Sequence, residues 1–216
     1  IAKKMNANDI LILVFQFIVL FFSMSVHEVS HGLIAYKLGD DTAKVMGRLS
    51  LNPLKHIEVF GSIILPLFLV LTNSPILFMW AKPVPFNPLN LKNPKTGAAL
   101  IGLAGPLSNL SLAIIFGIII RFVGAFMPEA LVLILFLNII VYLNVLFAVF
   151  NLVPIPPLDG SKLLFALLPD KYYEAQRFAE QYGIFILLIF ILFLFNFINP
   201  VIDGLFHLIV GKWVSI

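Results

Sequence analysis

The feature that most constrains this chain is a series of long apolar runs that carry almost no charge. The first extends from Ile10 to Val26, and others occupy Gly97–Phe126, Leu131–Leu152 and Gly183–Phe197. A helix that crosses a bilayer needs about 20 mainly apolar residues. Within lipid, only helices and closed barrels satisfy every backbone polar group. The runs therefore predict an all-α polytopic membrane protein.

The composition fits a chain of 216 residues that lies almost wholly in or at a membrane. Hydrophobic residues make up 61% and charged residues 12%, whereas soluble domains have about 45–50% and about 25%. The net charge of +3 falls in loops, so it bears on topology and gives no sign of nucleic-acid binding. The lack of cysteine excludes disulfides, thiolate ligands and a cysteine nucleophile.

We expect one membrane-embedded domain over residues 1–216, with about five to six transmembrane helices. Core helices are expected at about 8–37, 97–126 and 131–168, and peripheral apolar segments at 59–80, 183–197 and 201–210. The 59–80 segment is broken at Pro66 and at residues 72–75, and each half is too short to cross, which favours a re-entrant hairpin. Four prolines predict an extended conformation for residues 81–94.

The segment Thr42–Leu51 has a period of two. Small or apolar residues at 43, 45, 47, 49 and 51 alternate with mainly polar ones. This pattern predicts a strand or β-hairpin directly after the first helix. Its edge could pair with an extended peptide by strand addition.

The pentapeptide HEVSH lies near the end of the first apolar run. His31 lies four positions after His27, so on a helix both imidazoles face one metal ion. Glu28 directly follows His27 and lies within reach of a water molecule at that metal. This is the HExxH pattern of zinc hydrolases. Ionisable groups at membrane depth are costly and usually functional, so the pattern indicates an intramembrane zinc protease.

A catalytic zinc ion usually has three protein ligands, and the third is expected to be a carboxylate. Asp159 is favoured because prolines at 154, 156 and 157 open the chain there and Gly160 follows. Irregular backbone at membrane depth lines a water-filled cavity or is buried in protein. The alternative role of Asp159 is an N-cap for a helix at 161–168. Other candidate acids remain open at Glu58, Glu129 and Asp203.

Three segments together resemble the site-2 protease family of intramembrane zinc metalloproteases. They are HEVSH, the sequence GPLSN at 105–109 and the sequence NLVPIPPLDG at 151–160. Their order and spacing match the family pattern over most of the chain. The architecture is similar to compact prokaryotic members without a PDZ module.

The resemblance implies one Zn²⁺ per chain, bound by His27, His31 and Asp159, with Glu28 as the catalytic base. It also implies that Asn151 lies near the site and contacts substrate or the oxyanion. Asn109 is a second candidate for that role, with a structural interhelix hydrogen bond as its alternative.

Two other histidines receive different interpretations. His56 is expected to be a loop histidine, a possible gate or a secondary site residue. Asp203 and His207 share a helix face near the end of the chain and are interpreted as structural.

The expected substrate is a transmembrane protein or peptide, cleaved in regulated intramembrane proteolysis, with membrane lipids as neighbours and no nucleic acid. Two other functions are the alternatives: an intramembrane metal transporter and a catalytically silent membrane scaffold. A transporter is expected to repeat His and Asp clusters on adjacent helices, whereas 97–126 contains neither histidine nor acid.

The basic residues predict the orientation in a prokaryotic cell membrane. If His31 and Asp159 share a metal, their helices run parallel, and most basic residues fall on the side of the metal. Lys3, Lys4 and Arg121 fall on the other side. The positive-inside rule then places the active site toward the cytoplasm and the N-terminus outside. The basic residues on the metal side are Lys37, Lys44, Arg48, Lys55, Lys82, Lys92, Lys95, Lys162, Lys171 and Arg177.

Overall fold

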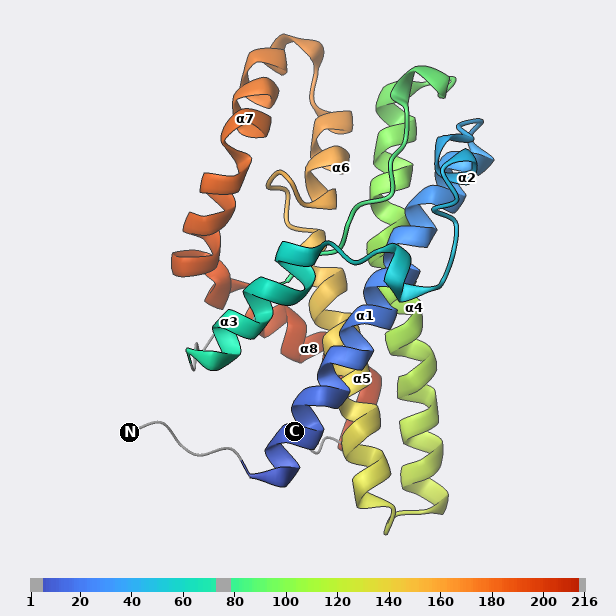
Figure 1. Ribbon diagram of the computed structural model, residues 1–216, viewed down its shortest axis with the longest axis vertical. Helices are drawn as coiled ribbons and strands as arrows, with labels where there is room; N and C mark the ends of the chain where they lie inside the picture. The colour runs from blue at the N-terminus through green and yellow to red at the C-terminus, as the bar shows by residue number, and fades with distance from the viewer. Residues whose placement is uncertain (1–5, 73–78, 214–216) are drawn as a thin grey trace.

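The computed structural model describes residues 6–72 and 79–213, and within them the regular structure is entirely helical (Figure 1). Four helical stretches are long and apolar enough to cross a membrane. The all-α polytopic membrane class is therefore confirmed, with four such stretches where five to six were expected. The four are α1 (Ala7–Lys37), α4 (Pro94–Phe126), α5 (Leu131–Asn151) and the run Asp170–Phe197, which contains α7 (Tyr173–Ile189).

Local capping sets where the two longest helices begin. The Asn6 side chain accepts from the Asp9 amide, and the Asp9 carboxylate accepts from the Asn6 amide, which is a capping box. The Asn93 side chain accepts from the Thr96 amide, and Pro94 occupies the first turn of α4. Because proline lacks an amide hydrogen that this turn would leave unpaired, it is tolerated there.

Helix α4 packs against α1, α5, α6 (Asp159–Leu167) and α8 (Asn199–Val210). Figure 1 shows α4 and α5 running antiparallel and joined by a short turn at the lower end. Their contact forms the largest apolar core, to which α8 contributes its buried face. The fully or nearly fully buried residues of this core include Ala113, Ile120, Val141, Val145, Ile202 and Val210.

The chain between α5 and α6 is irregular, as expected from its prolines. Helix α5 ends at Asn151, residues 152–158 form turns, and α6 begins at Asp159. Gly160 permits these turns to pack closely on the start of α6, since a Cβ at that position would lie 2.2 Å from the Leu152 carbonyl oxygen. Helix α6 packs against α4.

The described part of the apolar segment expected at 59–80 contains a π-helical stretch, Val59–Ile64, followed by α3 (Leu65–Leu71). These 13 residues span about 20 Å, too short for a hydrocarbon core of about 30 Å. The backbone returns where the Trp80 amide donates to the Gly61 carbonyl at 3.3 Å. Residues 73–75 of the expected break lie outside the described residues.

The strand or hairpin expected at Thr42–Leu51 is wrong. Residues Thr42–Val45 form a helical turn, α2, and Gly47 then reverses the chain at φ +64°. The Asp40 carboxylate accepts from both the amide and the hydroxyl of Thr42. These local side-chain hydrogen bonds favour a turn over the extended conformation that alternation alone suggested.

Residues 79–87 run extended beside α1, without forming a regular strand. On one edge, alternate amides are paired: Trp80 with the Gly61 carbonyl, Lys82 with the His56 carbonyl and Val84 with the Glu28 carboxylate. The Arg48 guanidinium donates to the Lys82 carbonyl at 2.9 Å. These contacts place the 79–87 segment directly over the HEVSH turn of α1.

Candidate metal centre

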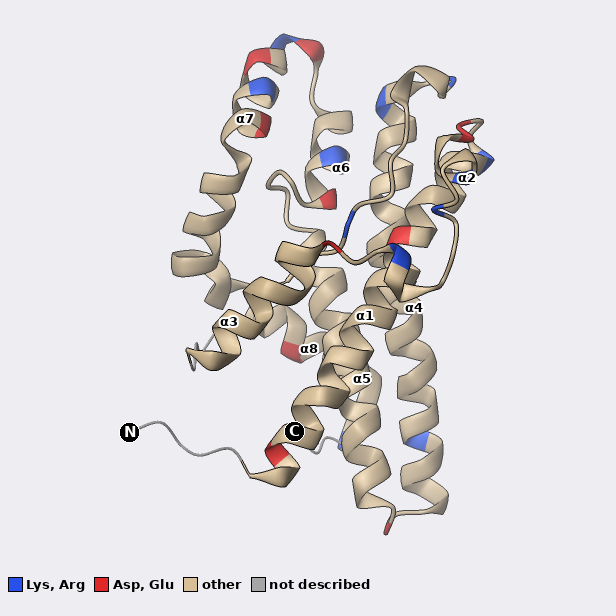
Figure 2. Cartoon of the chain, in the orientation of Figure 1, with Lys and Arg blue, Asp and Glu red and all other residues tan. Residues whose placement is uncertain are grey.

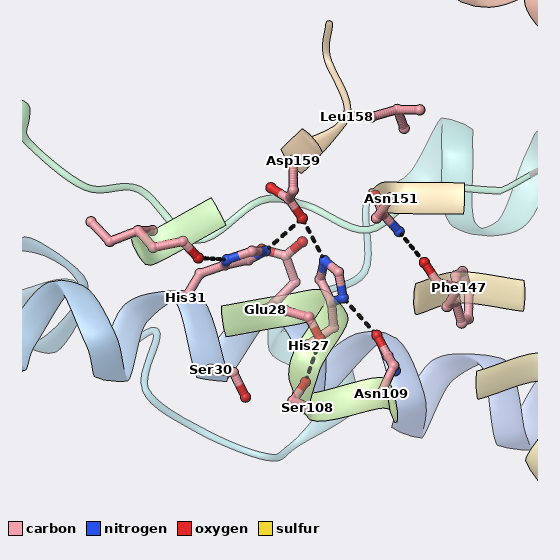
Figure 3. Close-up of polar contacts among 12 residues, drawn as sticks. His27, Glu28, Ser30, His31, Ser108, Asn109, Phe147, Asn151, Leu158 and Asp159 are labelled. Atoms are coloured by element: carbon pink, nitrogen blue, oxygen red, sulfur yellow. Dashed lines mark hydrogen bonds and ion pairs between the residues drawn. The ribbon is translucent and has the colours of Figure 1, made fainter. Parts of the chain in front are cut away.

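Three side chains from two helices converge in the interior of the molecule. The Nε2 atoms of His27 and His31 lie 3.0 and 3.1 Å from Oδ2 of Asp159, and Figure 3 shows both imidazoles pointing toward that carboxylate. All three residues are buried. Among the described residues, this is the one group of three or more His, Cys, Asp or Glu whose ligand atoms lie close enough to hold a metal ion.

The other nitrogen of each imidazole has a fixed partner. His31 Nδ1 lies 2.6 Å from the Ile101 carbonyl oxygen, which can only accept, so this nitrogen carries the hydrogen. His27 Nδ1 lies 2.6 Å from Asn109 Oδ1. The Asn109 amide nitrogen in turn donates to Asn144 Oδ1 and to the Ser23 carbonyl. These partners leave both Nε2 atoms available as ligands.

The donor set fits a zinc ion. With Nδ1 protonated, each neutral imidazole directs an Nε2 lone pair at a carboxylate oxygen, and a cation between them relieves that repulsion. Zinc–ligand distances of about 2.0–2.1 Å in a tetrahedron imply ligand separations of about 3.3 Å, close to those observed. Gly105 of α4 provides the necessary space, since a Cβ there would lie 2.5 Å from His27 Nε2 and 2.6 Å from His31 Nε2.

Asp159 is the first residue of α6, and its side chain makes no capping hydrogen bond. Its second oxygen, Oδ1, instead accepts from Lys162 Nζ at 2.8 Å. The alternative interpretation of Asp159 as an N-cap therefore does not describe the structure. Glu58, a competing acid, accepts from the amides of Phe60 and Gly61 and caps the π-helical stretch.

Glu28 and Asn151 border a cavity of about 360 Å³ beside the centre. Glu28 Oε2 accepts from the Val84 amide at 2.7 Å. Asn151 is the last residue of α5, and its amide nitrogen donates to the Phe147 carbonyl. Most of the lining is apolar and includes Met24, Trp80, Phe147, Phe150, Ile184 and Leu187.

The other candidate residues lie away from this cavity. Asn109 is fully buried, and both ends of its amide are hydrogen bonded. His56 is buried in a loop, where its Nε2 lies 2.7 Å from the Ser50 carbonyl oxygen. His207 pairs with the Asp203 carbonyl on exposed turns of α8. Neither His56 nor His207 joins the metal-ligand group.

Three contacts of the site were missed in the sequence. Asn144 accepts a hydrogen bond from Asn109. It could have been noticed as a polar residue within an apolar helix. Lys162 lies three positions after Asp159, a spacing at which helical side chains meet. Val84 reaches Glu28 through its backbone, for which the sequence carries no signal.

The chain is similar to proteins named as zinc metalloproteases. A family model described as Peptidase family M50 matches residues 127–194, which include Asp159. YwhC of Bacillus subtilis is 40% identical over 188 residues, covering 85% of this chain and 80% of the relative. MJ0392 of Methanocaldococcus jannaschii is 28% identical over 82% of this chain and 42% of its own length.

A third relative is Rip2 of Mycolicibacterium smegmatis, which is 31% identical over 79% of this chain and 63% of its own length. All three names contain the words zinc metalloprotease. No solved structure gives a significant match. Identity of 40% across most of both chains, together with the family model, shows the relationship. The chain belongs to peptidase family M50, the site-2 protease family of zinc metalloendopeptidases.

Proposed function

We propose that this integral membrane protein cleaves transmembrane segments of membrane-anchored substrates. One observation carries the proposal: the metal-ligand group and Glu28 border an apolar cavity that is lined by three of the helical stretches long and apolar enough to span a bilayer. A soluble peptide substrate would not require a cavity with so many aromatic and aliphatic side chains. A transmembrane segment, composed of such side chains itself, is complementary to it.

In this proposal His27, His31 and Asp159 hold the zinc ion. When bound, zinc supplies Lewis-acid chemistry, polarising a peptide carbonyl and acidifying water. The protein contributes the orientation of the ligands, through the Nδ1 partners of both imidazoles. It also contributes a buried site in which electrostatic interactions are strengthened.

Glu28 acts as the general base and then as the general acid. Its carboxylate borders the cavity, accepts a proton from the attacking water and returns that proton to the leaving amine nitrogen. The Val84 amide holds Oε2, which leaves Oε1 for the proton transfers. The overall reaction adds one water across one peptide bond and releases a carboxylate and an amine.

The substrate is expected to bind in an extended conformation, because the peptide bonds of an intact helix are shielded by their own hydrogen bonds. Ala81 lines the cavity, and in an extended segment its amide and carbonyl lie on the edge opposite the paired amides. An unwound substrate can hydrogen bond along this edge of the 79–87 segment. Asn151 borders the same cavity and is positioned to bind the substrate backbone.

The two other functions considered from the sequence lose support. Helix α4 lies at the centre of the fold yet contributes no histidine or acid to a relay of ion sites. The family is one of metalloendopeptidases, and Glu28 is present beside the ligand group. A transporter and a silent scaffold would each leave this arrangement unexplained.

The first test measures bound zinc per chain in purified protein. Wild type and Glu28→Gln are expected to bind about one zinc ion, whereas Asp159→Ala is expected to lose it, because the site then lacks its carboxylate. Zinc retained in Asp159→Ala would contradict the ligand assignment. Absence of zinc from folded wild type would contradict the metal centre.

The second test locates the cleavage. Wild type and Glu28→Gln are reconstituted into liposomes with a panel of single-span substrates, and products are identified by mass spectrometry. We expect cuts inside the apolar span with wild type only, with at least a hundredfold loss in the variant. Cuts confined to polar flanking residues would contradict cleavage within the membrane.

A further inference from the structure

The two oxygens of the Asp159 carboxylate have different partners. Oδ2 faces the Nε2 atoms of His27 and His31, while Oδ1 lies 2.8 Å from Lys162 Nζ. We propose that Lys162 restricts Asp159 to binding zinc through Oδ2 alone, and so keeps one coordination position free for the reaction. This inference rests on the proposed function, since it requires Asp159 to be a ligand.

The Lys162 side chain is held in place from three directions. It lies three residues after Asp159 on α6, so both side chains project from the same face. Its aliphatic part packs on α4 at Gly102, where a Cβ would lie 3.2 Å from Lys162 Cβ and from Lys162 Cδ. Its ammonium lies 5.9 Å from the centre of the Phe86 ring, which belongs to the 79–87 segment. The ion pair thus lies where α6, α4 and the 79–87 segment meet.

Gly102 also fixes the backbone of the ligand. A Cβ at position 102 would lie 3.0 Å from the Asp159 carbonyl oxygen. Helix α4 therefore contacts Asp159 and Lys162 at the same point. The side chain of Asp159 is 8% exposed and that of Lys162 32%, so solvent reaches the lysine more than the carboxylate. The lysine lies on the solvent side of the Asp159 carboxylate.

The coordination number explains why this matters. A catalytic zinc ion with three protein ligands keeps a fourth position open. A carboxylate that binds through both oxygens would occupy that position. An ammonium hydrogen bonded to Oδ1 prevents this, because Oδ1 cannot turn toward the metal without losing a charge-assisted hydrogen bond.

The positive charge of Lys162 allows a positioning role to be distinguished from a merely structural one. A cation near a metal ion opposes its binding, so removing Lys162 should not weaken zinc affinity. A residue that merely supported the fold of the site would weaken it. Lys162 is therefore a positioning residue, and its removal should change the geometry of the metal while leaving the metal bound.

The experiment uses the purified full chain, stripped with a chelator and reloaded with cobalt(II) as a spectroscopic substitute for zinc. Wild type should show the intense visible absorption of four-coordinate cobalt. Lys162→Met and Lys162→Gln should show a several-fold weaker spectrum, typical of a higher coordination number. Their zinc affinity should equal or exceed that of wild type, and Lys162→Arg should restore the wild-type spectrum.

Lys95→Met is the matched control. Lys95 also forms an ion pair, with Asp170 at 3.0 Å, and its replacement changes the net charge by the same amount. Its cobalt spectrum should match that of wild type. An unchanged four-coordinate spectrum in both Lys162→Met and Lys162→Gln would overturn the inference alone. Tenfold weaker zinc affinity in these variants would also overturn it. Failure of wild type to bind cobalt would overturn the metal centre and the inference together.

Discussion

At the scale of single residues, the orientation of His27 depends on partners behind it. Asn109 accepts from His27 Nδ1 and is itself oriented by donating to Asn144 and to the Ser23 carbonyl. This network selects the tautomer whose Nε2 is free to bind metal. Asn109 is completely buried within it, which favours a role in positioning over contact with the oxyanion.

Replacement of Asn109 separates these two roles. Asn109→Leu removes the acceptor, and we expect about a 10- to 100-fold loss of zinc affinity, measured by competition with a chelator. Asn109→Asp keeps an acceptor for His27 and should retain most of the affinity. If Asn109→Leu bound zinc as tightly as wild type yet lost cleavage, Asn109 would act on the substrate instead.

The residues expected to bind zinc could be found in the sequence because their chemistry imposes spacing. His27 and His31 must be four apart on a helix, and Asp159 follows a run of prolines that interrupts regular structure. The partners of these residues carry no such rule. The contact of Asn109 with His27, and that of Lys162 with Asp159, depend on how α4 and α6 pack, which a single sequence leaves open.

At the scale of elements, Asp40 connects the end of α1 to the end of the 79–87 segment and to the residues just after it. Its buried carboxylate accepts from the Thr42 amide and hydroxyl, the Asn87 amide and the Asn90 side chain. Burial acts to raise the pKa of Asp40, but these hydrogen bonds outweigh it and hold the pKa below its usual value. The carboxylate thus anchors the segment that contacts Glu28.

The lowered pKa of Asp40 predicts a loss of stability in acid. A carboxyl whose pKa is lower in the folded state stabilises the fold above its unfolded pKa of about 3.9, and this contribution disappears as the pH falls toward the folded pKa. Asp40→Asn should cost about 1–3 kcal/mol at pH 7. Thermal unfolding measured from pH 7 to pH 3 should show a smaller loss of stability in the variant. Parallel curves would contradict the prediction.

The incorrect prediction of a strand at Thr42–Leu51 has a physical explanation at the scale of elements. Alternation signals a strand when one face is buried against a core, but here the Asp40 carboxylate binds the Thr42 amide and hydroxyl and Gly47 reverses the chain. The extended conformation that the prolines predicted for residues 81–94 is found at 81–87, whereas Pro88–Asn90 form a short 3₁₀ helix and α4 begins at Pro94. The partners of the 79–87 segment lie on three other segments, because its amides bond to Gly61, His56 and Glu28, and no local pattern could identify them.

At the scale of the whole molecule, the path of the helices separates the charges. Figure 1 shows α1 ending and α4 beginning toward the upper end of the structure, while α5 runs upward from the α4–α5 turn at the lower end. Figure 2 shows the basic residues gathered toward the upper end, on α2, α6, α7 and the start of α4, with few near the α4–α5 turn. Arg121 lies at the opposite end, where it donates to the Ile209 carbonyl, and Lys3 and Lys4 fall outside the described residues. We propose that the basic end faces the cytoplasm.

Single cysteines test this orientation directly, because the chain contains none of its own. Lys171 and Glu129 are both exposed, the first before α7 and the second in the α4–α5 turn. On intact cells, a membrane-impermeant maleimide should label Glu129→Cys but should label Lys171→Cys only after the cells are permeabilised. The cysteine-free chain is the control. The reverse labelling would place the metal centre toward the outside, so that substrates would have to present their cleavable segment from the opposite face of the membrane.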